Sequence, residues 1–588
     1  MPVPSRPSRT HFCPLSRRLR WGLTLLFATA LTLELEFSRA PEWEGPLTLL
    51  TGLIVLGLLL EESQAYRGDT PPWAVLRARW FPTLLLLVVG VLAADRAWLF
   101  LHLGGDEVRR LLPRLHSADL LLFYGASALK LFVRSPRIET FLLHLERYPG
   151  RAIAVSFAAA ILVGTVLLSL PQAQALPERI SLIDSLFTAT SAVCVTGLVV
   201  NVIAEHYTLF GQLVILTLIQ LGGLGIMTFT ALFSLLSGRR MRIQDQLALQ
   251  GALDVEALGS VIQLLRRIFV ATLFTEGIGS LMLFLRFRPE AGDSWIALYQ
   301  AVFHAISAFS NAGFTLFPDN LARFAGDPTI IVVVTTLVIL GGIGFPVLDN
   351  LWDGFQHWRR GQAHRFRLTL HSKLVLTTTA VLLGVGTLLT LGLEWENTLA
   401  PLPWGQKLQA AYFHAVTPRT AGFHTLDVAR FAPATLFLTI LLMFVGGSPG
   451  STAGGIKTTS FGVILLTLRS LLKGRGEVEA FRRSIPQDLV NKAIGMAFAA
   501  LTFVCAALFL LLLTETGSFT TLAFETVSAF GTVGLSMGIT PQLSPLGKLI
   551  IAGTMFVGRI GPLTLALALA EQLTRGTYRY PSERVAIG

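Results

Sequence analysis

The sequence predicts an all-α polytopic membrane protein whose core repeats one unit four times: a helix, a half-length pore helix with a filter loop, and a second helix. Three observations support this prediction. The 588-residue chain is 52% hydrophobic and only 14% charged, with a mean hydropathy of +0.62, values typical of membrane proteins. A short motif that begins with Phe and closes with Gly and an apolar residue recurs four times. A Gly-rich motif then follows each copy in the next apolar segment, and two motifs repeating in phase are not expected by chance.

The net charge of +11 does not indicate a nucleic-acid partner. Lys and Arg gather in alternate loops between apolar runs, as the positive-inside rule predicts for a membrane protein. In the core, these basic segments lie at 237–242, 357–367, 473–483 and 574–584. The three cysteines, Cys13, Cys194 and Cys505, show neither metal-ligand nor redox spacing. For Cys194 we expect a small, weakly polar residue with its side chain turned away from the ion path.

Residues 1–150 form a predicted N-terminal extension of about four transmembrane helices. Its apolar runs begin at Trp21 and lie near 21–33, 46–60, 80–103 and 118–133. The first run is expected to be a retained anchor rather than a signal peptide, because Glu34 and Glu36 follow it directly. The basic tail ahead of it is expected in the cytoplasm. No run carries Arg at every third position, so a voltage sensor is not favoured.

Four repeats follow the extension. Their predicted boundaries are 151–245, 246–367, 368–485 and 486–588. The outer helices are expected near 152–170, 262–286, 371–393 and 491–514, and the second helices near 207–236, 328–353, 433–470 and 546–573. A span needs about 20 residues to cross a core about 30 Å thick. The pore helices are too short to cross, and re-entrant backbone is tolerated at that depth only where protein or water covers it. We therefore expect eight core spans.

The first repeated motif is predicted to form an ion selectivity filter. Its copies read FTATSAVCVTGL at 187–198, FHAISAFSNAGF at 303–314, FHAVTPRTAGF at 413–423 and FETVSAFGTVGL at 524–535. A dehydrated K⁺ needs rings of carbonyl oxygens, and Gly allows the backbone conformations that point them inward. We expect K⁺ to be bound by the backbone carbonyls of these loops. The predicted filter residues are Val193, Cys194, Val195, Thr196, Gly197, Ser310, Asn311, Ala312, Gly313, Thr420, Ala421, Gly422, Gly531, Thr532, Val533 and Gly534.

The second repeated motif predicts a gate. It reads LGGLG at 221–225, LGGIG at 340–344, VGGSPG at 445–450 and VGRIG at 557–561. In the third copy, residues 446–460 (GGSPGSTAGGIKTTS) cannot hold a continuous helix, and they predict a flexible intramembrane loop. A phosphate-binding P-loop is rejected because the Lys spacing is wrong and no strand precedes the stretch. The predicted gate residues are Gly446, Gly447, Ser448, Gly450, Gly454, Gly455, Lys457 and Arg559.

Arg559 stands where the first two copies have Gly223 and Gly342. A charge in mid-membrane costs about 3 kcal/mol or more unless it is paired or hydrated. We therefore expect Arg559 to face the water-filled path, either as a barrier to cations or paired with loop carbonyls. Lys457 is predicted to act similarly or to cap the following helix.

Five further polar residues stand in or beside predicted helices: Asp184, Glu276, His304, His414 and Glu525. Asp184 and Glu525 are placed near pore-helix starts, where they would cap the helix, pair with its dipole, or attract cations. The two histidines are expected to be hydrogen-bonded packing residues. Glu276 is expected to be a buried partner of a backbone or basic group.

Four stretches, SAFSNAGF, VTPRTAGF, ETVSAFGTVGL and GGSPGSTAGGIKTT, resemble the TrkH/KtrB family of bacterial potassium uptake proteins, and its KtrB-like branch most. The resemblance covers about 150–588; residues 1–150 match no part of that core. It implies a pseudo-fourfold core, a homodimer, the inner membrane, and gating by the 446–460 loop with Arg559 as its counterpart. It also implies a separate cytoplasmic regulatory ring of the RCK/KTN type, which would bind ATP/ADP or NAD(H). No cofactor is expected in this chain.

The sequence therefore predicts a K⁺ uptake channel or transporter rather than an enzyme. A membrane potential supplies about 2.3 kcal/mol per charge per 100 mV, so no ATP hydrolysis in this chain is required. The alternative is the translocating subunit of an ATP-driven K⁺ pump complex. A membrane enzyme is disfavoured because no catalytic or metal-spaced cluster is evident.

Overall fold

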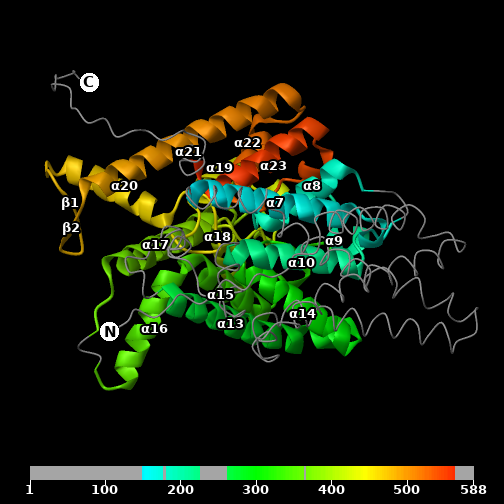
Figure 1. Ribbon diagram of the computed structural model, residues 1–588, viewed down its shortest axis with the longest axis horizontal. Coiled ribbons are helices and arrows are strands. Elements are labelled where there is room, and N and C mark those ends of the chain that lie inside the picture. The colour runs from blue at the N-terminus through cyan, green and yellow to red at the C-terminus, as the bar shows by residue number, and fades with distance from the viewer. Residues whose placement is uncertain (1–148, 177–179, 226–260, 363–365, 563–588) are drawn as a thin grey trace, which may run out of the picture. The chain divides into compact units, whose positions relative to one another are not determined.

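The computed structural model describes residues 149–176, 180–225, 261–362 and 366–562. This part of the chain is helical, apart from short links and one antiparallel pair of strands, β1 (Val478–Ala480) and β2 (Arg483–Ile485) (Figure 1). The predicted extension up to residue 148 and the basic segments 237–242 and 574–584 lie outside the described residues.

Four long apolar helices confirm the predicted outer helices. They are α7 (Pro149–Ser169), α13 (Val261–Ala291), α17 (Leu370–Leu393) and α21 (Gln487–Thr514). Each contains a stretch long and apolar enough to cross a membrane, and no more than 28% of that stretch is buried within the protein. The exposed apolar side chains fit contact with lipid, since a bilayer is the solvent in which such a surface is stable.

Four short helices occupy the predicted pore-helix positions. They are α8 (Leu182–Val193), α14 (Ser294–Phe309), α18 (Trp404–Val416) and α22 (Phe519–Gly531). Side-chain oxygens of Ser181, Asp293 and Ser518 cap the first, second and fourth of them, whereas Pro403 precedes the third. Their length, 12 to 16 residues, is too short for a full crossing.

The second helices are interrupted more widely than predicted. They are α10 (Leu209–Leu224), α15 (Pro328–Ile343) with α16 (Phe345–Arg359), α19 (Pro433–Phe444) with α20 (Thr458–Leu472), and α23 (Pro545–Ile560). The prediction of one continuous helix over 328–353 is wrong, because α15 and α16 meet at Gly344 with a bend of 102°. A break was predicted only for the third repeat.

One backbone feature explains these interruptions. The last glycine of the second motif has a positive φ in every repeat, namely Gly225, Gly344, Gly450 and Gly561. A residue in that conformation cannot continue a right-handed helix. Gly225, Gly344 and Gly561 each directly follow the last residue of α10, α15 and α23.

Short elements link each filter loop to its second helix. They are α9 (Ile203–His206), η4 (Ala322–Phe324), η6 (Val428–Arg430) and η7 (Thr540–Gln542), while η2 (Pro171–Ala173) follows α7.

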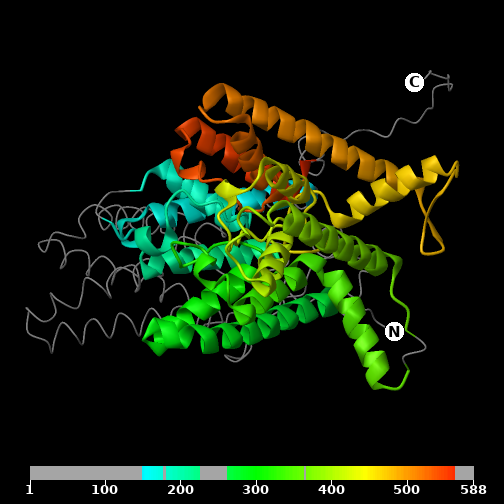
Figure 2. The same cartoon turned by 180° about the vertical axis from the view of Figure 1, so that it is seen from behind.

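The helices pack in a closed cycle. Each outer helix contacts its own pore helix, as α7 does with α8 and α13 with α14. Each second helix also contacts the pore helix of the next repeat: α10 with α14, α15 with α18, α19 with α22, and α23 with α8. The last pair brings the fourth repeat against the first, and Figure 2 shows α23 beside the first repeat. This cycle is the pseudo-fourfold core that the repeats predict.

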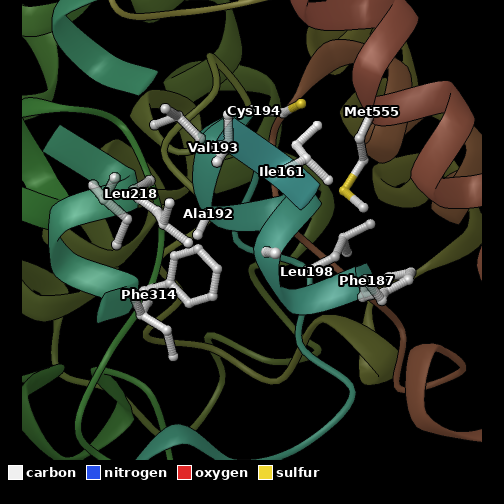
Figure 3. Packing of buried hydrophobic residues seen from close by; sticks show 14 of the residues in the cluster. Ile161, Phe187, Ala192, Val193, Cys194, Leu198, Leu218, Phe314 and Met555 are labelled. Carbon is white, nitrogen blue, oxygen red and sulfur yellow. The ribbon is translucent and has the colours of Figure 1, made fainter. Parts of the chain in front are cut away.

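A buried apolar cluster surrounds the carboxyl end of α8 (Figure 3). It joins side chains from the first, second and fourth repeats, among them Ile161, Phe314 and Met555. Cys194 is fully buried within this cluster. Its thiol therefore packs as a small hydrophobic group, in agreement with the prediction.

Candidate functional site

The four filter loops share one backbone conformation. The residue two positions before each glycine has a positive φ: Val195 (57°), Asn311 (59°), Thr420 (74°) and Thr532 (51°). The glycines Gly197, Gly313, Gly422 and Gly534 also have positive φ, from 69° to 91°. Left-handed backbone at a non-glycine residue costs about 1–3 kcal/mol and persists only where the surroundings impose it. Four strained residues at equivalent positions indicate that this loop shape is a built feature.

The four glycines form a closed ring. A Cβ on Gly313 would lie 2.8 Å from the Ala421 carbonyl oxygen and 2.9 Å from Gly422 Cα, in the next loop. A Cβ on Gly422 would lie 2.6 Å from the Val533 carbonyl oxygen.

The remaining two glycines complete the circuit. A Cβ on Gly197 would meet the Ala312 carbonyl oxygen, and one on Gly534 would meet the Thr196 carbonyl oxygen. A Cβ on Gly534 would also lie 3.0 Å from Gly197 Cα, so the contacts return to the first loop. Each glycine faces a carbonyl of its neighbour, so no side chain fits anywhere in the ring.

The same backbone hydrogen bond holds each of the four filter loops against its pore helix. The backbone N–H of the residue before the glycine donates to the carbonyl of the motif Ser or Thr. These bonds are Thr196 to Ser191 (2.8 Å), Ala312 to Ser307 (2.7 Å), Ala421 to Thr417 (2.9 Å) and Val533 to Ser528 (2.8 Å). Donor and acceptor are five residues apart in the first, second and fourth repeats, and four residues apart in the third repeat. The residue missing from the third copy is therefore lost from the turn after the pore helix, and Gly422 keeps its place in the ring.

In the third repeat, the copy of the second motif continues into a loop. This loop lies on the side of the glycine ring where the pore helices end. Gly446 N–H donates to the Ile456 carbonyl (2.9 Å), which closes the base of the loop. Its body is hydrogen-bonded to the second repeat, from Ser448 N–H to the Gly342 carbonyl (3.0 Å). Gly454 N–H donates to the Thr532 hydroxyl (3.1 Å), so the loop also contacts the fourth filter loop directly.

Arg559 joins this loop to the first repeat. Its guanidinium donates to the Thr452 carbonyl in the loop and to the Gly222 carbonyl in the first second-motif copy. The sequence left two roles open for Arg559, a barrier to cations or a partner of loop carbonyls. The structure shows the pairing with a loop carbonyl. Together with the bond to Gly342, it brings all four copies of the second motif into one layer.

Lys457 is the N-cap residue of α20, but its side chain makes no capping bond. Its ammonium donates instead to the Ala453 carbonyl within the loop (2.7 Å). Lys457 thus binds the loop internally, whereas Arg559 joins the loop to another repeat.

The structure corrects two predictions about buried acids. Glu525 lies in the middle of α22, fully buried, where it accepts from the Thr540 hydroxyl; Ser518 is the N-cap. Glu276 is buried and accepts from the Gln220 amide at 3.2 Å and 3.3 Å, and not from a backbone or basic donor in the described part of the chain. In both cases a neutral polar group on an adjacent segment supplies the hydrogen bond.

Other predictions about polar residues are confirmed. Asp184 lies in the first turn of α8, where its charge favours the helix dipole, and it pairs with Lys548 at 2.6 Å. His304 Nδ1 donates to the Gln300 carbonyl (2.7 Å), and the ring stacks on a phenyl ring. His414 contacts the Thr439 hydroxyl at 3.0 Å. Both histidines are buried packing residues.

The sequence did not predict two features of the layer that the four copies of the second motif form. Thr452 was not among the predicted gate residues although it supplies the carbonyl for Arg559. The elbow at Gly344 was also missed. Its signal was available, because Pro346 follows Gly344 closely and a glycine with a nearby proline marks one helix end and the next helix start.

Residues 151–579 match the model of a protein family described as TrkH, cation transport protein. The chain is 44% identical to the Ktr system potassium uptake protein B of Bacillus subtilis over 75% of this chain and 97% of that protein. It is 40% identical to the potassium/sodium uptake protein NtpJ of Enterococcus hirae, again over 75% of this chain and 97% of the relative. The crystal structure of the potassium transporter TrkH from Vibrio parahaemolyticus shares the fold, with a TM-score of 0.58 and 18% identity over 84% of this chain and 98% of that one.

Proposed function

We propose, because this chain belongs to the TrkH family of cation transport proteins, that it takes up K⁺ through its pseudo-fourfold core. The ion would pass through the glycine ring, bound by backbone carbonyls of the sixteen predicted filter residues. The membrane potential would drive it, since about 2.3 kcal/mol per 100 mV acts on each charge.

The closed glycine ring is the observation that carries this proposal. Four loops at equivalent positions place backbone carbonyls next to four glycines, and rings of carbonyl oxygens are what replaces the water around K⁺. The four pore helices end directly before the loops, so the partial negative charge of each carboxyl end favours a cation there. The B. subtilis relative is named as a potassium uptake protein, which agrees with this ion.

The layer formed by the 446–460 loop and Arg559 is proposed as the gate. It lies on the pore-helix-end side of the ring, in contact with Thr532. The charged side chains of this layer are Lys457 and Arg559. Both are positive and would oppose the passage of a cation. Opening requires the bonds from Arg559 to Thr452 and Gly222 to break, and these come from different repeats.

The chain is proposed to act as a homodimer in the bacterial inner membrane, with a separate nucleotide-binding ring as its regulator. The name "Ktr system" given to the relatives from B. subtilis and Vibrio alginolyticus supports partner subunits. ATP/ADP or NAD(H) would then act on the ring and not on this chain.

Flux by the purified chain in lipid vesicles tests the proposal. We expect Rb⁺ or K⁺ uptake that follows an imposed membrane potential and needs no ATP. Flux that required ATP hydrolysis by a co-purified ATPase would favour the alternative, a translocating subunit of a pump. Absence of flux in vesicles, together with failure to rescue a bacterium deficient in K⁺ uptake, would contradict both.

A further inference from the structure

Two ion pairs, one near each end of α13, indicate how α15 and α16 are placed along the membrane normal. Arg267 donates to Asp349 of α16 at 2.7 Å, and Arg286 pairs with Asp327, the N-cap residue of α15. Between them, residues 268–285 of α13 carry one acid, Glu276, and rise about 27 Å at about 1.5 Å per residue. That length is close to the hydrocarbon core of about 30 Å. The two pairs therefore mark the two edges of the core.

This depth places α16 at one surface of the membrane. α15 starts at the edge marked by Asp327 and ends near the edge marked by Asp349. The chain then turns by 102° at Gly344. A helix that turns by about a right angle after crossing the core runs along the surface, and Figures 1 and 2 show α16 directed away from the long helices. The basic segment 357–367 places this surface on the cytoplasmic side by the positive-inside rule.

The two faces of α16 differ in chemistry. Asp349 and Asp353 face Arg267 of α13, and Val347 is fully buried. The other face exposes an aromatic stripe, Trp352 (53%), Phe355 (46%) and Trp358 (66%), with neighbouring rings 5.7 Å and 5.9 Å apart.

The exposed Arg359 and Arg360 follow this stripe directly. Trp side chains prefer the membrane interface, and amphipathic helices with basic residues lie in it. Arg also binds phosphate groups through paired hydrogen bonds.

The first residue of α16 is hydrogen-bonded to the loop of the third repeat. Phe345 N–H donates to the Gly450 carbonyl at 2.9 Å. At the elbow, a Cβ on Gly344 would lie 2.5 Å from the Pro449 carbonyl oxygen. The last turn of α15 binds the same loop, through Gly341 and Gly342. A change in the direction of α16 therefore acts directly on the loop backbone.

We propose that α16 is a lipid-binding regulatory element. Its aromatic stripe lies among the headgroups of the cytoplasmic leaflet, Arg359 and Arg360 bind anionic lipid phosphates, and the helix transmits this contact to the 446–460 loop through Gly344. The second half of this inference rests on the proposed gate, whereas the lipid contact stands on geometry alone.

A nitroxide at Phe355→Cys tests the lipid contact without any flux measurement. Cys505 is exposed and Cys194 is buried, so the label is placed in a Cys13→Ser, Cys505→Ser background. In vesicles of phosphatidylcholine and phosphatidylglycerol, we expect high accessibility to oxygen and low accessibility to a water-soluble nickel chelate. High accessibility to the chelate would overturn the contact. Low accessibility to both would instead indicate a second copy or a protein partner, and would equally overturn it.

Flux tests the regulatory part. We expect severalfold faster Rb⁺ uptake in vesicles with phosphatidylglycerol than in phosphatidylcholine alone, and loss of this difference in Arg359→Gln/Arg360→Gln. The matched control, Lys473→Gln/Arg482→Gln, removes two exposed charges outside α16 and should keep the difference. Equal flux in both lipids by the unmodified protein would overturn the regulatory role. Absence of all flux with a lipid-exposed label would instead contradict the proposed function.

Discussion

The glycine ring and the layer beside it come from the same four repeats but differ in symmetry. In the ring, every repeat contributes the same backbone shape, and the third repeat keeps it despite a missing residue. In the lower layer, the repeats contribute unlike parts: a carbonyl from Gly222, carbonyls from Gly341 and Gly342, a loop, and Arg559. Equivalent carbonyls suit the coordination of a spherical ion, whereas unlike parts allow one element to move alone. We therefore propose that the ring selects the ion and that the layer controls flux.

The largest expected effect comes from the ring. Gly313→Ser and Gly534→Ser should each lower the K⁺/Na⁺ flux ratio at least about fivefold, because both positions have positive φ and face a neighbouring carbonyl. Strain of about 1–3 kcal/mol at one position corresponds to roughly 5- to 150-fold. Competitive Rb⁺ and Na⁺ uptake in vesicles measures the ratio. Gly553→Ser on α23 is the control, since no atom lies within 4 Å of its added Cβ. Unequal changes in the flux ratio at the two positions would show that the four repeats do not contribute equally to the ring.

Removing the bridge across the lower layer should change the amount of flux and leave its selectivity unchanged. In Arg559→Ala, the bonds to Thr452 and Gly222 are lost, and we expect uptake to rise severalfold. Arg559→Lys keeps the charge but lacks the fork that reaches two acceptors, so it should give an intermediate rise. Initial rates of Rb⁺ uptake measure both variants. Unchanged rates would remove Arg559 from the gate.

Thr532 connects the two levels, because its backbone belongs to the ring and its hydroxyl accepts from Gly454 N–H. Thr532→Val removes the hydroxyl at nearly constant volume. A net hydrogen bond is worth about 1 kcal/mol, so uptake should rise about fivefold at most. The K⁺/Na⁺ ratio should stay the same, as measured by competitive uptake. A change in the ratio without a change in rate would show that the side chain serves the ring alone.

The smallest effect on flux is expected outside the ring and the layer, at Glu394, which follows the last residue of α17. Burial raises the pKa of this carboxyl, but hydrogen bonds from the Ala432 N–H and from Thr398 outweigh it and hold the pKa below its usual 4.5. Its stabilising contribution is therefore present above about pH 4.5 and is lost as the pH falls through the lower pKa of the folded state.

Glu394→Gln should accordingly lower the Tm at neutral pH by a few degrees. The difference from the unmodified protein should shrink as the pH falls below 4.5, with the K⁺/Na⁺ ratio unchanged throughout. Thermal unfolding in detergent over a pH series measures it. A Tm difference that grows on acidification would contradict the hydrogen-bonding assignment.

The features that repeat in the sequence were the predictable ones. Four copies of each motif indicate the outer helices, pore helices and filter loops, because the same backbone task recurs and requires Gly at the same place. Contacts between unlike partners were not predictable. The Gln220–Glu276 pair joins residues 56 positions apart, and Arg559 reaches Gly222 across 337 positions. No local pattern specifies which carbonyl a buried side chain will meet.

The prediction also failed where two signals competed. The apolar run 328–353 favours a continuous helix, yet Gly344 with a positive φ and Pro346 end one helix and begin another. The sequence predicts Glu525 near a helix start, whereas α22 begins six residues earlier, at Phe519.

The most direct test of the central claim is anomalous X-ray scattering from crystals of the full chain grown in Rb⁺. The ring account predicts an anomalous peak on the axis enclosed by Gly197, Gly313, Gly422 and Gly534, and its loss in the Gly534→Ser variant. Rb⁺ bound elsewhere, with none inside the ring of the unmodified protein, would contradict it.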